Sequence, residues 1–268
     1  MVVKKDLNKE MIKISNGGKE TKLIEIILSK KNQLIETIKK EYEFNFVDFQ
    51  TVFYPNNNNR YTTIEVVSKN QPERQHFINP KNIRQSKKPK PDLINKMMMF
   101  EEIAIKLIFS NKLNLKNQSC PVYHCINGFS HPQLKPYLKI FNDRAIKEKK
   151  LIMDTLNKDS NPERRAAAAF LMGHFSSPRE IITLLSSHVD DSDDAVRNNM
   201  MRVIAATMEK AKINQINIRP FLSLLDSPYA TDRDKALYVL STAVESNSSK
   251  KLLIQKGSDK LLALLQLK

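Results

Sequence analysis

A spaced motif occurs three times in the second half of the chain. Each copy begins with Asp-Ser, at Asp159, Asp191 and Asp226, and six or seven residues after that Asp an arginine opens a run with helical spacing of apolar residues. Shorter apolar runs lie between the copies. A helical hairpin of this size cannot bury its apolar face alone, so hairpins that recur every ~30–45 residues stack on one another. The pattern therefore predicts a row of stacked helical hairpins.

This pattern resembles the HEAT-repeat family of armadillo-like α-solenoids, in its shorter bacterial form. The resemblance rests on the Asp in the turn of each repeat and on the Arg early in the second helix, and it covers about residues 145–268. It implies a ladder in which these side chains bridge successive repeats. The third copy has one extra residue between Asp226 and Arg233, so the place of Asp226 in the ladder stays open. The ladder residues expected by position are Asp159, Arg165, Asp191, Arg197, Asp226 and Arg233.

Four consecutive alanines, Ala166–Ala169, mark the expected seam between helices. Counted from the arginine, positions three, six and seven of each second helix are apolar, and position eight is small. At ~100° per residue these positions form one continuous arc. We therefore expect that arc to be buried against neighbouring helices, which the alanines allow to approach closely. Helix starts are indicated by Asn161 before a proline, by Ser177 and by Thr231.

The opposite arc of the second helices, at positions two, five and nine after the arginine, is the candidate binding surface. In HEAT solenoids the second helices line the concave surface, so the resemblance implies that this stripe faces a partner. Aromatic and arginine side chains are typical of binding hot spots. The alternative is a mixed solvent-facing surface on which Phe170 packs against a neighbouring helix. The expected binding ridge comprises Phe170, His174, Asn199, Arg202, Lys235 and Tyr238.

Residues 1–78 contain no repeat. Residues 19–42 have the apolar spacing of a helix, and residues 43–69 contain two β-branched and aromatic segments around a Pro-Asn turn, which predicts a β-hairpin. The expected fold class is therefore α+β, mostly α. It consists of a small N-terminal helix/β-hairpin region (1–78), a basic linker (79–92) and a HEAT-like α-helical solenoid (93–268), whose repeats are clearest in 145–268.

The net charge of +15 is unevenly distributed along the chain. Residues 1–150 hold 28 basic against 15 acidic residues, whereas residues 151–268 hold 16 against 14. Excess positive charge suggests nucleic acid or an acidic membrane surface, but a Lys- and Asn-rich composition is also typical of AT-rich genomes, and charged linkers are often only solvated connectors. The linker has no interleaved aromatic side chains on which bases stack. The candidate anion or nucleic-acid contacts are Lys81, Arg84, Lys87, Lys88 and Lys90.

The chain has two cysteines, Cys120 and Cys125. Together with His124 and His131 they place four potential zinc ligands within twelve residues. The cysteines lack a Cys-x-x-Cys spacing, however, and His124 and Cys125 are neighbours that would point differently on a helix. We therefore expect ordinary thiols and imidazoles, no bound metal and no disulfide framework, as in a reducing compartment.

No catalytic motif stands out in the sequence. It has no glycine-rich phosphate loop, no Gly-x-Ser-x-Gly and no His-Glu-x-x-His. HEAT-like metal hydroxylases use His-Glu pairs, which this sequence lacks, and HEAT-like DNA glycosylases use a basic groove, whereas the repeats here are almost neutral. The expected function is a non-catalytic scaffold, without cofactor, that binds an unidentified protein. Nucleic-acid binding through the basic first half is the main alternative, and an enzymatic site in the N-terminal region is a third.

The two ends of the chain give two further expectations. The first twenty residues do not resemble a signal peptide, and no run of ~18 apolar residues predicts a transmembrane helix, so we expect a cytoplasmic protein. The apolar sequence LLALLQL near the other end predicts a helix without the polar outer face of a terminal cap. Such a helix favours cover by a second copy of the chain, by a partner or by further chain.

Overall fold

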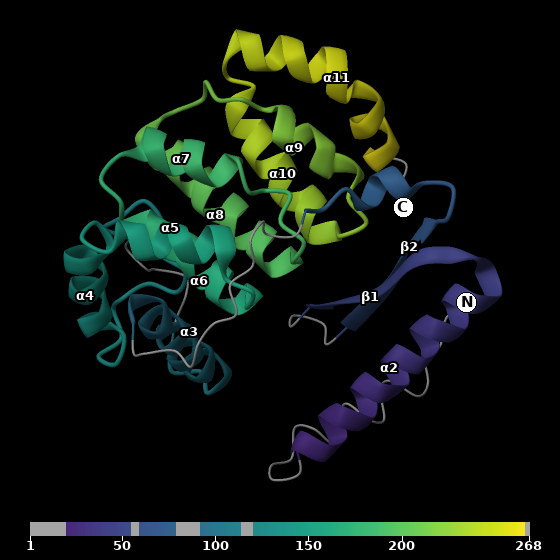
Figure 1. The fold of residues 1–268 in the computed structure, drawn as a ribbon, viewed down its shortest axis with the longest axis horizontal. Helices are drawn as coiled ribbons and strands as arrows, with labels where there is room; N and C mark the ends of the chain where they lie inside the picture. Colours follow the sequence, from purple (N-terminus) through teal and green to yellow (C-terminus); the bar gives the residue numbers. More distant parts are fainter. Residues whose placement is uncertain (1–19, 55–58, 79–91, 114–119, 266–268) are drawn as a thin grey trace. The chain divides into compact units, whose positions relative to one another are not determined.

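The computed structural model describes residues 20–54, 59–78, 92–113 and 120–265. Over these residues the chain is mostly helical and contains one two-stranded antiparallel sheet (Figure 1), which confirms the expected α+β, mostly α class. It divides into two compact units, Met1–Arg74 and Gln75–Lys268. None of the described helices combines the length and the apolar character that a bilayer crossing requires.

The first unit contains α2 (Glu20–Tyr42), β1 (Phe44–Tyr54) and β2 (Asn59–Ser68). The strands pair antiparallel, with Phe49 opposite Ile64. α2 packs against β1, and Lys31 Nζ donates to Asp48 Oδ1 at 3.2 Å and to the carbonyl oxygen of Phe49 at 3.1 Å. The helix and the hairpin predicted from residues 19–69 are therefore both present.

The second unit is a series of helices that pack in pairs. α5 packs on α6, α7 on α8, and α9 with its continuation η3 packs on α10. α6 also lies between α3 and α8, and α8 lies between α6 and α10, so that α3, α6, α8 and α10 form one row, in front of which Figure 1 shows α5, α7 and α9. α11 packs on α9 and η3. The elements are α3 (Leu93–Phe109), α4 (Lys135–Ala145), α5 (Lys149–Lys158), α6 (Pro162–Leu171), η2 (Met172–His174), α7 (Pro178–Ser186), α8 (Asp194–Ala211), α9 (Arg219–Ser223), η3 (Leu224–Asp226), α10 (Ala230–Ala243) and α11 (Asn247–Leu265).

Side-chain caps fix where α3, α6, α7 and α8 begin. Asn161 Oδ1 accepts a hydrogen bond from the Glu163 amide at the start of α6, and Ser177 Oγ accepts one from the Glu180 amide at the start of α7. Both starts are as predicted, with proline at the first helical position. The predicted start at Thr231 is wrong, because the N-cap residue of α10 is Tyr229, two residues earlier, and it makes no side-chain cap.

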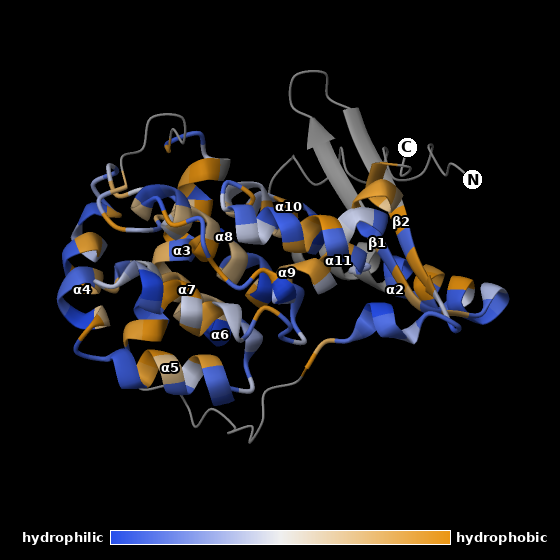
Figure 2. Cartoon of the chain, turned by 90° about the horizontal axis from the view of Figure 1, so that it is seen from above, coloured by the Kyte–Doolittle hydropathy of each residue, from blue (hydrophilic) through white to orange (hydrophobic). Residues whose placement is uncertain are grey.

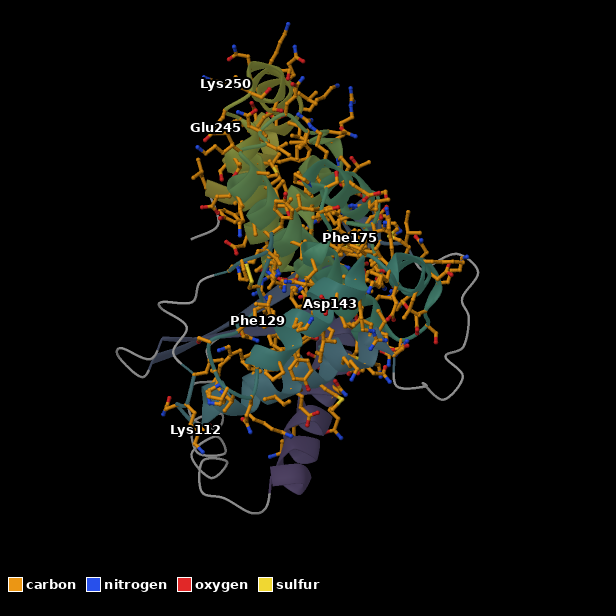
Figure 3. The ribbon with its side chains drawn as sticks, turned by 90° about the vertical axis from the view of Figure 1, so that its left-hand side faces the viewer. Lys112, Phe129, Asp143, Phe175, Glu245 and Lys250 are labelled. Atoms are coloured by element: carbon orange, nitrogen blue, oxygen red, sulfur yellow. A yellow bond between two sulfur atoms is a disulfide. The ribbon has the colours of Figure 1, made fainter. Side chains whose placement is uncertain are left out.

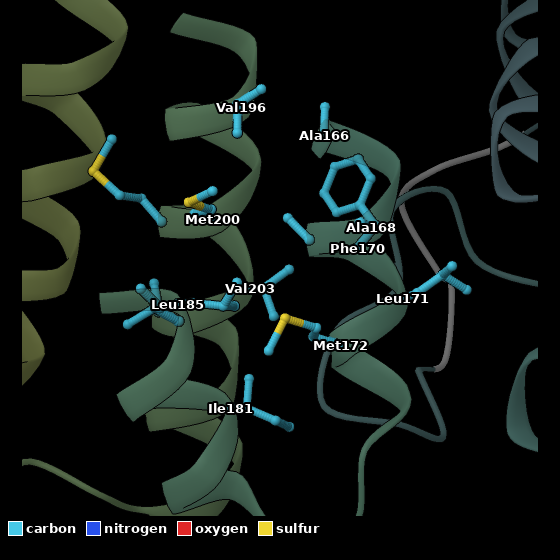
Figure 4. Packing of buried hydrophobic residues seen from close by; sticks show 14 of the residues in the cluster. Ala166, Ala168, Phe170, Leu171, Met172, Ile181, Leu185, Val196, Met200 and Val203 are labelled. Carbon is cyan, nitrogen blue, oxygen red and sulfur yellow. The ribbon is translucent and has the colours of Figure 1, made fainter. Parts of the chain in front are cut away.

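The alanine stretch forms a closely packed seam, as its sequence predicted. Ala167, Ala168 and Ala169 are fully buried, and Figure 4 shows α6 and α8 meeting across this seam with Ala168 and Val203 between them. Every residue from Arg164 to Leu171 is buried, since α3 and α8 flank α6 on both sides. Figure 2 shows hydrophobic and hydrophilic residues alternating along most of the other helices, as burial of one side requires.

Arginine side chains bridge successive helical pairs. Arg165 donates from Nε and Nη2 to the two carboxylate oxygens of Asp191, at 2.9 and 2.7 Å, and from Nη1 to the carbonyl oxygen of Asp159. Arg197 repeats this arrangement: Nε donates to Asp232 Oδ2 at 2.9 Å, and Nη1 donates to the carbonyl oxygen of Asp191 at 2.7 Å. Each arginine thus ties the turn of its own pair to a carboxylate of the next pair.

The third copy of the motif departs from this arrangement. Arg233 Nη1 donates to the carbonyl oxygen of Ser227, but Asp226, expected by position in the ladder, does not lie opposite Arg197 and pairs with Lys260 of α11 instead. Asp232, in the first turn of α10, occupies the place next to Arg197. The extra residue puts Ser227 at the position that the aspartate holds in the other two copies, and the Ser227 hydroxyl donates to Asp232 Oδ2 at 2.6 Å.

A short segment, residues 76–78, follows the 3-10 helix η1 (Pro72–Gln75) and lies over the second bridge. The Ile78 amide donates to the carbonyl oxygen of Asp190 at 2.7 Å, and the Ser192 amide donates to the carbonyl oxygen of Ile78 at 3.0 Å. These bonds place the Phe77 ring 3.7 Å from the Arg197 guanidinium, which has no exposed surface. This segment therefore belongs to the second unit, and the boundary between the units lies after Arg74 and not after residue 78.

The bridge geometry predicts a large difference between two aspartate variants. Asp232→Ala leaves the Arg197 guanidinium buried without its carboxylate, which should lower the free energy of unfolding by about 3–5 kcal/mol. Asp226→Ala removes a partly exposed ion pair with Lys260 and should cost about 1 kcal/mol or less. Urea unfolding of both variants measures the difference, and equal losses would show that the bridge assignment is wrong.

Candidate functional site

The expected binding ridge is exposed only in part. Phe170, His174 and Asn199 are 2%, 6% and 8% exposed, so the expectation that they face solvent is wrong. Arg202 and Lys235 are partly exposed, and Tyr238 is 47% exposed. The stripe therefore has a covered part on α6, η2 and the beginning of α8, and an open part on α10.

The covered part lies beneath residues Cys120–Phe129, which we call the covering loop. The Tyr123 amide donates to the carbonyl oxygen of Gly173 at 3.0 Å, and Lys210 Nζ donates to the carbonyl oxygens of Cys120 and Val122. The Phe129 ring, labelled in Figure 3, packs into the core 5.1 Å from the Phe100 ring. Sequence reasoning missed this loop, although the alternative of a packed Phe170 anticipated its effect.

His124 is the most buried of the residues between the two cysteines of the loop. It stacks parallel on the Phe170 ring, with centroids 5.0 Å apart and planes inclined by 9°. Gly173 makes this approach feasible, because a Cβ there would lie 3.0 Å from His124 Cβ and 3.1 Å from its carbonyl oxygen. The small residue at position eight of this helix therefore accommodates the loop.

Cys120 and Cys125 form a disulfide, with Cα atoms 5.5 Å apart. The expectation of two free thiols is therefore wrong, because the loop turns back on itself and brings the two side chains together. The disulfide also removes both sulfur atoms as thiolate ligands, so Cys120, His124, Cys125 and His131 do not make a zinc site here.

Four ionisable side chains gather beneath and beside the loop. Burial raises the pKa of Glu101, on α3, to about 7, against the opposing charge of Arg202 on α8. Burial, with the nearby charges of Arg202 and His174, lowers the pKa of His124 to about 3. Burial lowers the pKa of His174 to about 4. Both imidazoles are therefore neutral at physiological pH, whereas the Glu101 carboxyl titrates near neutrality.

The hydrogen bond of His174 fixes its tautomer. His174 Nδ1 lies 2.7 Å from Asn142 Oδ1, and since an amide oxygen only accepts, the neutral ring donates from Nδ1. Glu101, His124 and His174 are groups of the kind that transfer protons in enzymes, but the covering loop closes the space beside Phe170. A cavity of about 740 Å³ lies elsewhere, between α7 and the segment before α9, and none of these groups lines it.

The open part of the stripe is held by local contacts on α10. Tyr238 Oη donates to Glu209 Oε2 of α8 at 2.7 Å, an interaction that raises the pKa of Tyr238. Lys235 pairs with its neighbour Asp234, and Leu237 is 37% exposed beside them. This part offers an aromatic ring, an aliphatic side chain and charges of both signs.

The candidate anion contacts Lys81, Arg84, Lys87, Lys88 and Lys90 lie outside the described residues. Comparison with models of known protein families, with curated proteins and with solved structures gives no match to this chain.

The buried histidines predict how stability depends on pH. Each has a folded pKa below its unfolded value near 6.5, so its contribution to stability is present above pH 6.5 and is lost as the pH falls toward 4. Glu101, whose folded pKa is raised, acts in the opposite sense. Relative to the wild type, His174→Gln should reduce the loss of unfolding free energy between pH 6 and pH 5 by about 1 kcal/mol.

Urea unfolding at pH 6.0, 5.5 and 5.0 measures this dependence. His131→Gln is the matched control, because His131 is partly exposed and contacts its own turn through Nδ1. An unchanged pH dependence in His174→Gln would contradict the assignment of a buried, neutral imidazole.

Proposed function

We propose that this chain is a non-catalytic, HEAT-like scaffold whose second helices present a binding surface to a protein partner. The repeated bridges support the solenoid part of this proposal, because Arg165 and Arg197 make equivalent contacts in successive helical pairs. The row of α3, α6, α8 and α10, in which each helix packs on its neighbours in the row, is the arrangement that stacked repeats produce.

One observation carries the binding part of the proposal. Among the described residues of the second unit, most of the exposed large apolar side chains lie on its last two helices: Leu237 and Tyr238 on α10, and Ile254, Leu262 and Leu265 on α11. Apolar side chains that gather in one patch mark interaction sites, and Leu237 and Tyr238 are neighbours on α10. Tyr238 adds a phenol hydroxyl one helical turn after Lys235, and tyrosine is one of the residue types enriched in binding hot spots.

The open part of the stripe can be tested with surface variants. Tyr238→Ala should reduce capture of specific partners about 10-fold or more, as the loss of a hot-spot tyrosine does, and should leave folding intact because the ring is half exposed. Tyr42→Ala is the matched control, since Tyr42 is 63% exposed in the other unit. Affinity purification with quantitative mass spectrometry compares the variants, and unchanged partners with Tyr238→Ala would refute the assignment.

A second candidate function rests on charge. The excess of basic residues in the first 150 positions favours an acidic partner such as nucleic acid. Replacing Lys81, Arg84, Lys87, Lys88 and Lys90 by Gln should then abolish binding of a labelled oligonucleotide, and wild-type binding should weaken steeply with salt. The matched control replaces Lys250, Lys251 and Lys256, exposed residues of α11. No mobility shift with the wild type at low salt would remove this candidate.

A further inference from the structure

The covering loop contacts the second helices as a bound peptide would. Its backbone supplies one donor, the Tyr123 amide, to the carbonyl oxygen of Gly173, and two acceptors, the carbonyl oxygens of Cys120 and Val122, to Lys210 Nζ. Backbone contacts of this kind are indifferent to side-chain identity, and main-chain hydrogen bonds are a usual source of affinity in peptide recognition. Another segment that turns back on itself in the same way could therefore make the same three bonds.

One side chain adds specificity to these backbone contacts. The His124 ring stacks on Phe170, and the Arg202 guanidinium lies 5.4 Å from the centroid of the same Phe170 ring. Without the loop, the surface of α6, η2 and α8 would present an aromatic ring, a guanidinium and an ammonium group. We call this surface the Phe170 groove. Aromatic and arginine side chains are enriched at binding hot spots, and a planar side chain is what the groove accepts.

The disulfide confines the part of the loop that touches the groove. All the backbone contacts and the His124 stack are made by Cys120 or by residues between the two cysteines. Phe129, by contrast, is anchored in the core against Phe100 and His174. Opening of the ring therefore frees the contacting residues locally and leaves Phe129 in place.

Reduction supplies the chemistry for that opening. A dithiol transfers two electrons and two protons to the Cys120–Cys125 bond, which gives two free thiols while the dithiol becomes a disulfide. The disulfide closes a ring of about six residues and so reduces the conformational freedom of the released loop. Reduction should therefore raise the equilibrium constant for opening by roughly 30- to 40-fold. The corresponding free energy is comparable to that of the few hydrogen bonds and the ring stack that hold the loop in place.

We propose that the Phe170 groove is a peptide-binding site that the chain fills with its own disulfide-closed loop, and that reduction opens it to a peptide turn of a partner that carries a planar side chain. This inference rests on the proposed scaffold function and names the partner chemistry and the regulation for the covered part of the stripe. The loop itself is the evidence for the occupant, because it shows which backbone and ring contacts the groove makes.

Amide hydrogen exchange of the full chain tests the opening. Addition of dithiothreitol should speed exchange of residues 120–125 about 10-fold or more, while the interior of α8 stays protected. Cys120→Ser/Cys125→Ser should exchange fast with and without dithiothreitol. Equal protection of the loop in the oxidised and reduced protein would overturn the proposal.

A peptide in trans tests the site. The probe is a fluorescein-labelled peptide with the sequence of residues 120–129 and serine in place of both cysteines, and fluorescence anisotropy measures its binding. The recipient carries Cys120→Ser/Cys125→Ser and His124→Gly, which weaken the chain's own loop and leave the groove intact. The probe should bind this variant at least 10-fold more tightly than the oxidised wild type.

Two lysine variants locate the bound peptide. Lys210→Met in the same recipient should weaken the probe about 10-fold, because it removes the donor to two carbonyl oxygens. Lys212→Met, at the exposed end of the same helix, should have no effect. Absence of probe binding to the recipient, or equal binding to the oxidised wild type, would overturn the proposal.

These measurements are independent of the proposed open surface. Tyr238→Ala should leave probe binding unchanged, because Tyr238 lies on α10 and its hydroxyl donates to Glu209. Absence of probe binding to the recipient would therefore reject the Phe170 groove as a peptide site. Unchanged partner capture by Tyr238→Ala would reject the open surface as a binding site.

Discussion

The buried guanidinium of Arg197 is the interaction on which the rest of the second unit depends. It bonds the turn before its own helix, through the carbonyl oxygen of Asp191, and the carboxylate of Asp232 on the next helix, and the Phe77 ring covers it. A charge with no exposed surface must have these partners in place, because its loss of hydration is compensated only when they are all present. The contact therefore fixes how α8 and α10 lie relative to each other, and with them the stripe of residues that both helices present.

Features encoded by neighbouring residues could be predicted from the sequence. The caps at Asn161 and Ser177, the antiparallel hairpin and the alanine seam follow from local patterns of turn residues, β-branched residues and small side chains. The partner of Arg197 could not be predicted in this way, because Asp226 was expected there and does not take that place. One extra residue before Arg233 changes which carboxylate reaches Arg197, so the partner comes from the first turn of α10 and not from the preceding turn. The extra residue was visible in the sequence, but its effect depends on the three-dimensional path of the turn.

The covering loop could not be predicted, because its contacts join residues far apart in a segment without periodicity. Lys210 and Cys120, for example, are 90 positions apart. Two signals pointed toward it: a phenylalanine in a stripe expected to face solvent, and a glycine at position eight of the same helix. Both have one explanation, since Phe170 supplies the surface on which His124 stacks and Gly173 provides the space for it. The two cysteines gave no guide, because their short separation is compatible with free thiols as well as with a closed ring.

Loop opening depends on pH as well as on reduction of the disulfide. His124 stacks on Phe170 as a neutral ring, and its burial, with the nearby charge of Arg202, holds its pKa at about 3 in this place. A released loop exposes the ring to water, where its pKa returns toward 6.5. Protonation therefore stabilises the released loop relative to the bound one below pH 6.5. Acid and reductant thus act on one equilibrium, because each removes a different restraint on the same six residues.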